Sequence, residues 1–312
     1  MVLDPEARAA LAEIARVDDA FVPGRPGFDL LRTRREYRAQ SVARSRAGRP
    51  VPVARVTDLD ADGVRCRMFA PEGRAPVVLY VHGGGWTLGS PEECEPFCRR
   101  LTLRSGWTTI APDYRLAPEH PYPAALEDIE CVLAWLRERG DALDLDTSRL
   151  ALAGDSAGAN LVAATALRAR DRGDPGIAHQ ALLCPALDLV GDFPSRRLFA
   201  HGFGLEPESM SWSVSAYAPD PSVRERADVS PLRATSLAEL PPTLIATAEH
   251  DPLRDEGEAY AARLADAGNV VTATRHLGAI HFFTDPTRFA AADTLVDQIA
   301  CALRRVVATS LA

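Results

Sequence analysis

The chain has 312 residues, of which 46% are hydrophobic and 25% charged, a composition typical of a globular protein with a full apolar core. Its formal net charge of −8 and pI near 5.4 argue against a nucleic acid as partner, because binding to phosphates needs a basic surface. All 35 basic residues are arginine, which excludes a catalytic lysine or a Schiff base.

Targeting signals and cysteine frameworks are missing from the sequence. The N-terminal stretch carries acidic residues early and has no unbroken apolar core of signal-peptide length, and no window of about 18 apolar residues predicts a membrane span. The six cysteines follow no framework spacing. Cys94 and Cys98 lie four residues apart, but no second pair or nearby histidine completes a metal site. We therefore expect a cytoplasmic protein with reduced thiols, no metal and no membrane contact.

The predicted elements begin with two helices and then alternate between strands and helices. Residues 5–16 and 27–44 have helical spacing of apolar side chains and precede any strand signal. Strands are predicted at 49–59, 63–71, 75–86, 107–114, 145–156, 179–188, 241–251 and 270–276. Helices are predicted at 91–106, 126–140, 157–173, 256–268 and 288–307.

This alternation predicts an α/β fold with a mostly parallel central sheet of about eight strands and helices on both faces. The alternation lapses between residues 187 and 230, where the sequence is mixed and rich in turns, as in an insertion over one edge of the sheet. We therefore expect N-terminal cap helices at 1–50, a catalytic domain at 51–186 and 231–312, and a cap insertion at 187–230.

A serine lies between glycines where a predicted strand becomes a helix, in Gly154-Asp155-Ser156-Ala157-Gly158. Gly-x-Ser-x-Gly in this context is the nucleophile-elbow pattern of α/β-hydrolases, in which a strained turn lifts the serine oxygen clear of the sheet. A Cβ two residues to either side would collide with the neighbouring elements. The pattern alone is only moderately specific, because small residues also flank serines by chance.

A second motif, His82-Gly83-Gly84-Gly85-Trp86, follows the predicted buried strand. Consecutive glycines leave backbone amides free of side chains, and a developing oxyanion needs such fixed donors. A plain glycine-rich turn or a phosphate loop is the alternative, but neither GxGxxG nor a following Lys-Ser/Thr is present. The job expected for His82 is to hold this loop by hydrogen bonding.

A serine nucleophile needs a histidine base that is oriented by a carboxylate. Five of the seven histidines lie before the last predicted strand: His82, in the glycine loop, and His120, His179, His201 and His250. In the α/β-hydrolase fold the base follows the last strand, so His281, in the loop after Gly278, is predicted to be the base rather than His276 at the strand end.

The loop that follows the strand 241–251 offers candidates for the carboxylate that orients the histidine. Asp251 comes first after that strand, whereas Asp255 and Glu256 are expected to begin the next helix, where acids suit its N-terminal dipole. The predicted order Ser156, Asp251, His281 is the order of the α/β-hydrolases.

Four stretches together resemble the hormone-sensitive-lipase-like esterases, called the bacterial family IV: HGGGW, DYRLAPEHPYPAALED, GDSAGAN and DPLRDEGEAYA. The resemblance runs from about residue 75 to the C-terminus, and the first fifty residues resemble the cap helices of that family. It implies an α/β-hydrolase fold and a carboxylesterase that acts on short acyl esters without metal or organic cofactor. It also implies that the amides of Gly84, Gly85 and Ala157 form the oxyanion hole, and that residues 113–128 form a scaffold beside the site. It favours a homodimer through the last strand and helix.

Two positions depart from the family pattern. Gly158-Ala159-Asn160 replaces Gly-Gly-Asn, and Phe282 follows His281 where the family has glycine, which could narrow the pocket. The residues leave open an amidase, a lactonase or another acyl hydrolase on the same triad. A small-molecule receptor without turnover is disfavoured, because receptors that resemble this family typically lose the catalytic histidine.

Overall fold

The central strands of the sheet are the most continuously apolar stretches of the chain. The structure is a computed structural model that describes residues 2–17, 19–47, 50–174 and 176–309. In β3 (Ala75–Val81) and β7 (Thr243–His250) nearly every residue is buried, on both faces of the sheet. Such strands belong at the centre of a parallel sheet whose two faces are covered by helices.

Eight strands form one sheet among the described residues, in the order β1-β2-β4-β3-β5-β6-β7-β8. The two N-terminal strands pair antiparallel with their neighbours, and all pairings from β4 to β8 are parallel. The predicted mostly parallel sheet is therefore confirmed. The remaining strands are β1 (Arg55–Ala61), β2 (Val64–Ala70), β4 (Thr108–Pro112), β5 (Leu145–Asp155), β6 (Ile177–Leu183) and β8 (Val271–Ile280).

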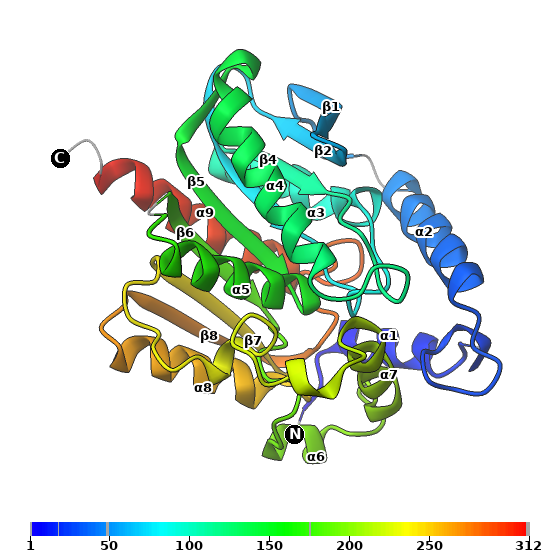
Figure 1. The fold of residues 1–312 in the computed structure, drawn as a ribbon. Coiled ribbons are helices and arrows are strands. Elements are labelled where there is room, and N and C mark those ends of the chain that lie inside the picture. The colour runs from blue at the N-terminus through cyan, green and yellow to red at the C-terminus, as the bar shows by residue number, and fades with distance from the viewer. Residues whose placement is uncertain (1, 18, 48–49, 175, 310–312) are drawn as a thin grey trace.

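Helices cover both faces of this sheet (Figure 1). On one face lie α3 (Pro91–Ser105) and α9 (Ala291–Thr309), whose apolar residues share a core cluster with the sheet. On the other face lie α4 (Ala124–Arg139), α5 (Ala157–Asp171) and α8 (Arg254–Asp266), with a second cluster. Within the described ranges, no helix is both long and apolar enough to traverse a bilayer.

The structure shifts several predicted boundaries. The strand predicted at 270–276 runs from Val271 to Ile280, because its pairing with β7 resumes after a bulge, with Ile280 opposite His250. His276 therefore lies inside the strand and His281 directly follows its end. The strand predicted at 49–59 begins only at Arg55, and residue 49 lies outside the described residues. The last helix begins at Ala291, three residues later than predicted.

Two stretches outside the alternation, which we call the cap segments, are the described parts of 1–50 and 187–230. They contain α1 (Pro5–Ile14), α2 (Leu30–Ala47), α6 (Pro194–Leu198) and α7 (Pro207–Tyr217), which gather beyond the carboxyl ends of the parallel strands (Figure 1). Arg25 is ion-paired with Glu206, and the rings of Phe28 and Trp212 meet edge to face at 4.9 Å. The two cap segments thus pack on each other although some 180 residues separate them.

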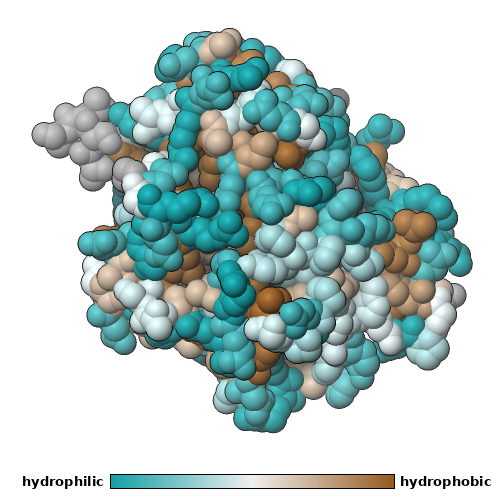
Figure 2. Space-filling view, viewed as in Figure 1, coloured by the Kyte–Doolittle hydropathy of each residue, from teal (hydrophilic) through white to brown (hydrophobic). Residues whose placement is uncertain are grey.

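The surface in this view is mostly hydrophilic, with hydrophobic residues in small separate groups (Figure 2). Exposed large hydrophobic side chains occur singly on both cap helices and strands, among them Leu31 on α2 and Leu277 on β8. Scattered hydrophobic residues of this kind are ordinary for a folded surface.

One side-chain amide holds both ends of the insertion 187–230. Nδ2 of Asn160, on α5, donates to the carbonyl oxygens of Ala186 at 2.8 Å and Val229 at 2.9 Å. Because Asn160 is fully buried, these two bonds are shielded from water. The chain therefore leaves α5 and the sheet near Ala186 and returns to the same point near Val229.

A buried carboxylate fixes the start of the insertion. Glu256 lies in the first turn of α8, as predicted, but it is not an exposed acid at the helix terminus. Its side chain is fully buried, and one carboxylate oxygen accepts from the amide of Leu187 at 2.6 Å. Nη2 of Arg196, on α6, lies 2.6 Å from its other oxygen. Burial raises the pKa of Glu256 to about 7, against the opposing charge of Arg196.

We predict that Arg196→Met destabilises the protein in a pH-dependent way. The raised pKa means that Glu256 binds its proton more tightly in the folded state, so the stability linked to it is kept at low pH and lost as pH rises through about 7. Without Arg196 the carboxylate is buried and unpaired, and the free energy of unfolding should fall by ~2–4 kcal/mol at pH 8 and by less at pH 6. Urea unfolding at the two pH values measures this difference.

The matched control is Arg197→Met. Arg197 is the next residue, its side chain is largely exposed, and it pairs with the exposed Asp192. It should change the free energy of unfolding by well under 1 kcal/mol at either pH. Equal losses at pH 6 and pH 8 for Arg196→Met would contradict the role assigned to Glu256.

Candidate active site

Ser156 sits in a strained turn between β5 and α5. Its φ of 53° and ψ of −118° lie where non-glycine residues are rare, and its amide donates to the carbonyl oxygen of Leu183 at 2.8 Å. A Cβ at Gly154 would lie 2.7 Å from the carbonyl oxygen of Val81, and one at Gly158 only 2.1 Å from the same atom. The expectation that neither glycine can carry a side chain is confirmed.

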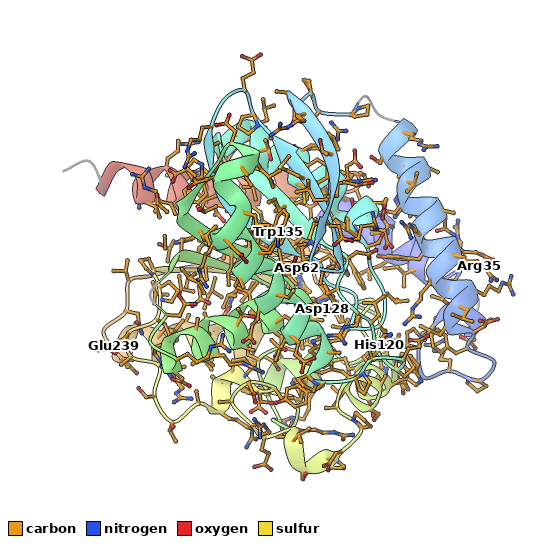
Figure 3. All side chains as sticks on the ribbon, turned by 45° about the horizontal axis from the view of Figure 1, so that its top comes forward. Arg35, Asp62, His120, Asp128, Trp135 and Glu239 are labelled. Carbon is orange, nitrogen blue, oxygen red and sulfur yellow. The ribbon has the colours of Figure 1, made fainter. Side chains whose placement is uncertain are left out.

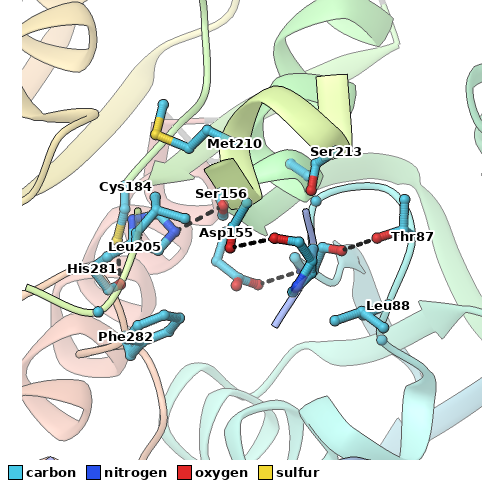
Figure 4. Close-up of a pocket in the computed structure, with 18 of the residues that line it drawn as sticks. Thr87, Leu88, Asp155, Ser156, Cys184, Leu205, Met210, Ser213, His281 and Phe282 are labelled. Atoms are coloured by element: carbon cyan, nitrogen blue, oxygen red, sulfur yellow. Dashed lines mark hydrogen bonds between the residues drawn. The ribbon is translucent and has the colours of Figure 1, made fainter. Parts of the chain in front are cut away.

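The structure brings Ser156, His281 and Asp251 into one hydrogen-bonded chain, and Figure 4 shows Ser156 and His281 at the pocket. Nε2 of His281 lies 2.9 Å from Oγ of Ser156, and Nδ1 lies 2.8 Å from Oδ2 of Asp251. Asp251 is fully buried, and its other oxygen accepts from the amide of Leu253 at 2.9 Å. Each residue leaves the carboxyl end of a different parallel strand, which is why sites far apart in the sequence meet here.

The charge and the hydrogen bond of Asp251 favour the protonated form of the His281 imidazole. Burial alone would lower the pKa of His281, but the charge of Asp251 and its hydrogen bond outweigh burial and hold the pKa above its ordinary value. A histidine fixed by a carboxylate at Nδ1 presents its Nε2 to the serine hydroxyl. This arrangement can take a proton from Ser156 and keep the resulting imidazolium stable.

Asp155, next to the serine, ties the glycine loop to the nucleophile turn. Its Oδ1 accepts from the amide of Gly83 at 3.0 Å and from the hydroxyl of Tyr80 at 2.8 Å. A Cβ at Gly83 would lie 2.4 Å from the other carboxylate oxygen, so this glycine is needed for the close approach. Sequence reasoning did not single out Tyr80, and the signal available was a hydroxyl-bearing residue in an otherwise aliphatic strand.

His82 holds the same loop from the other side. Its Nδ1 lies 2.8 Å from the carbonyl oxygen of Gly83, and its ring stacks on Tyr114 with centroids 4.3 Å apart. The hydroxyl of Tyr114 donates to the carbonyl oxygen of His82 at 2.8 Å. Burial lowers the pKa of His82, so the ring is neutral at physiological pH and acts as a loop brace, as the sequence predicted.

The glycines of this loop adopt conformations that suit few other residues. Gly84 has a φ of 115° and Gly85 a φ of 58°, and a Cβ at Gly84 would lie 2.3 Å from the carbonyl oxygen of Leu88. Both glycines line a cavity together with Ser156 and with Ala157, the first residue of α5. The three residues whose amides are expected to hold an oxyanion thus line the same cavity as the serine.

The cavity has a volume of about 1180 Å³ and extends from Ser156 under the cap segments. Aromatic residues of the glycine loop and of the base loop line this cavity, whereas two aromatic residues of the insertion do not. Trp86 and Phe282 do line it, whereas among the described residues of its wall neither Phe203 nor Trp212 is found. Phe203 stacks on the ring of His250 instead, and Trp212 packs on Phe28.

The other titratable candidates have structural partners. His276 lies on β8 with its ring 4.8 Å from that of Phe283, and burial lowers its pKa. Asp255 accepts from the amide of Ser195. Among the described histidines, His281 is the one with a hydrogen bond to Ser156.

Two groups of three potential metal ligands occur in the described part of the chain. One consists of Cys184, Asp251 and His281, in which the carboxylate and the imidazole are already bonded to each other. The other consists of the cap residues His201, Glu206 and Glu208, in which Glu206 is paired with Arg25. Cys94 and Cys98 lie one turn apart on α3 as free thiols, and Sγ of Cys98 donates a weak hydrogen bond to Sγ of Cys94 at 3.7 Å.

The Pro-rich connection before α4 braces the glycine loop. The amide of Ala117 donates to the carbonyl oxygen of Trp86 at 3.0 Å, and the amide of Arg115 donates to Asp128 at 2.7 Å. Asp128 lies on α4 and His120 on the connection, close to α2 (Figure 3). The contacts of residues 113–128 are those of a scaffold rather than of reacting groups.

Comparison with known proteins finds matches over most of the chain. A family model described as the alpha/beta hydrolase fold matches residues 78–285. Esterase LipI of Mycobacterium tuberculosis is 40% identical over 227 residues, which is 70% of this chain and 71% of LipI. Carboxylic ester hydrolase LipN of the same organism is 41% identical over 238 residues, 72% of this chain and 63% of LipN.

A solved structure matches almost the whole chain. The hyperthermophilic esterase from the archaeon Pyrobaculum calidifontis superposes with a TM-score of 0.91 at 37% identity, covering 98% of this chain and 99% of that one. The chain is therefore similar to proteins named as esterases both in sequence and in fold.

We predict that the reaction of Ser156 with an organophosphate reagent depends on a group that titrates above pH 6.5, the ordinary pKa of histidine. His281 must be neutral to accept the serine proton, so the rate should fall as pH drops through its raised pKa. In Asp251→Asn the rate at neutral pH should fall by ~10⁴-fold, and the midpoint should move to lower pH, because the charge that favours the imidazolium is gone.

The rate of inactivation, followed by mass spectrometry from pH 5 to 9, measures both effects. Asp255→Asn is the matched control, since that carboxylate contacts Ser195 and not His281, and it should leave the profile unchanged. A midpoint that does not move in Asp251→Asn would contradict the assignment.

Proposed function

The chain belongs to the hormone-sensitive-lipase-like carboxylesterases of the α/β-hydrolase superfamily, and on this premise we propose that it hydrolyses short-chain acyl esters through Ser156, His281 and Asp251. The observation that carries the proposal is the unbroken pair of hydrogen bonds from the serine hydroxyl through the imidazole to the buried carboxylate.

In the first half of the reaction, Oγ of Ser156 attacks the ester carbonyl while Nε2 of His281 takes the hydroxyl proton. Asp251 keeps the imidazole in the required tautomer and stabilises the imidazolium. The tetrahedral intermediate collapses when His281 passes the proton to the departing alcohol, leaving the acyl group on the serine. In the second half, His281 takes a proton from the water that attacks the acyl-enzyme and returns it to Oγ of Ser156 as the acid is released.

The negative charge on the tetrahedral oxygen is stabilised by the amides of Gly84, Gly85 and Ala157. Support comes from their place on the cavity wall around the serine and from the bonds that fix the loop, through Asp155 on one side and His82 on the other. Donors that are already fixed need no reorganisation during the reaction, and removal of one such donor typically costs ~10²–10³ in rate.

The preference for short acyl groups is supported by the charge of the cavity wall. The cap helices bring charged side chains to the lining, among them Arg16, Glu36 and Arg44. A long alkyl chain that extended past these groups would desolvate them without supplying a polar partner. A short acyl group can bind close to the serine and leave them hydrated.

The described parts of residues 1–50 and 187–230 are assigned as a cap over this site, with the catalytic domain at 51–186 and 231–312. Both cap segments contribute lining residues, for example Ile14 from the first and Met210 from the second. The role of a binding receptor without turnover fits less well, because such a receptor has no need for an imidazole at 2.9 Å from a serine hydroxyl.

We predict that Ser156→Ala lowers kcat/KM for p-nitrophenyl acetate by ~10⁴–10⁶-fold without altering the fold, because the variant lacks the nucleophile but keeps the rest of the site. Stopped assays on purified protein measure the rate, and circular dichroism checks the fold. A folded variant with a rate near that of the wild type would mean that another residue is the nucleophile.

Acyl-chain preference gives a separate prediction. Among p-nitrophenyl acetate, butyrate and laurate, kcat/KM should be highest for acetate or butyrate and at least about tenfold lower for laurate, because a lauroyl chain would desolvate charged lining residues such as Arg16 and Arg44 without offering them a polar partner. A maximum at laurate would overturn the short-chain assignment and leave the serine mechanism intact.

A further inference from the structure

Phe282 occupies the position beside the proposed base. It directly follows His281, and its ring meets the imidazole edge to face, with centroids 5.4 Å apart and planes at 80° (Figure 4). The ring is partly buried against the core cluster under α9 and lines the cavity. A phenyl group therefore lines the cavity beside the imidazole of the proposed base.

Three separate segments meet at this ring. Gly204, in the insertion, has a φ of 92°, and a Cβ there would lie 2.8 Å from Cε2 of Phe282 and 3.2 Å from Cδ1 of Ile14 at the end of α1. The ring thus lies beside Gly204 of the insertion as well as beside the base, and Ile14 of the other cap segment lies near the same point. A ring that moved toward the insertion would meet Gly204.

The reaction geometry decides which half of a substrate faces this wall. The ester carbonyl oxygen points to the amides of Gly84, Gly85 and Ala157, whereas the departing oxygen must lie within hydrogen-bond distance of Nε2 of His281 to receive its proton. The group attached to that oxygen is the alcohol. Since Phe282 adjoins His281, the alcohol half is the part of the ester that meets its ring.

Building on the proposed function, we propose that Phe282 limits the size of the alcohol half, so that the site accepts esters of slim primary alcohols and rejects those of bulky, branched or cyclic alcohols. The ring does this by the volume that it occupies beside the base, with Gly204 and Ile14 close to it. The acyl half, which is attached to the carbonyl carbon and not to the departing oxygen, is not subject to this limit.

The experiment compares two substrate pairs in Phe282→Ala and Phe282→Leu. The alcohol pair is ethyl acetate and cyclohexyl acetate, and the acyl pair is ethyl acetate and ethyl cyclohexanecarboxylate. We expect the ratio of kcat/KM for cyclohexyl acetate to that for ethyl acetate to rise at least about tenfold in Phe282→Ala and by less in Phe282→Leu, in proportion to the volume removed. The ratio for the acyl pair should change by less than about twofold.

Phe28→Leu is the matched control. Phe28 is an aromatic residue that joins the two cap segments through Trp212 but does not line the cavity wall among the described residues. If general loosening of the cap admitted bulky alcohols, this variant would raise the alcohol ratio as well, and the proposal would fail. Thermal unfolding of each variant confirms that the ratios come from folded protein, and Phe282→Leu keeps most of the packing should Phe282→Ala unfold.

The outcomes separate this inference from the proposed function. A wild-type protein that cleaves none of the three esters would overturn the esterase proposal itself. A wild type that cleaves ethyl acetate, combined with an alcohol ratio that stays constant in both Phe282 variants or with a rise in the acyl ratio instead, would overturn the role of Phe282 alone.

Discussion

The backbone turn at Ser156 is the constraint on which the rest of the site depends. The serine can stand at a φ of 53° only because Gly154 and Gly158 let the carbonyl oxygen of Val81 approach to distances that no Cβ would tolerate. The strained turn is held by the hydrogen bond from the amide of Ser156 to the carbonyl oxygen of Leu183 and by the packed sheet on either side. Once this turn is fixed, Asp155 can reach the glycine loop, so that one strand end sets the position of both the nucleophile and the amides opposite it.

The sheet and the main site residues could be predicted from the sequence because they depend on local patterns. Apolar runs identify buried strands, and Ser156, Asp251 and His281 each follow such a run, so the common edge of a parallel sheet brings them together. The family resemblance fixed their order. The ends of the strands were harder to predict from the sequence. The end of β8 depends on pairing that resumes after a bulge, and the apolar pattern of the sequence does not reveal that pairing.

Long-range side-chain contacts could not be predicted. Glu256 has the sequence context of an ordinary helix-terminal acid, and only the fold reveals its burial under Arg196 and Leu187. The sequence marks Phe282 by its place after His281, but it does not show which aromatic rings reach the cavity: Phe203 stacks on His250, and Phe282 lines the cavity. Such differences arise from how the cap segments pack, and the amphipathic pattern of their helices does not specify a partner.

The two bonds of Asn160 have a consequence for how this fold can change over evolution. Asn160 bonds to both ends of the insertion 187–230, and the amide of Leu232 donates to the carbonyl oxygen of Leu187, so the two ends are held together by contacts at the ends themselves. A segment of another length or sequence could be exchanged there while the sheet kept its register. In this respect the insertion can be replaced as a unit. A protein built this way can acquire different residues over its pocket while Ser156, Asp251 and His281 keep their positions.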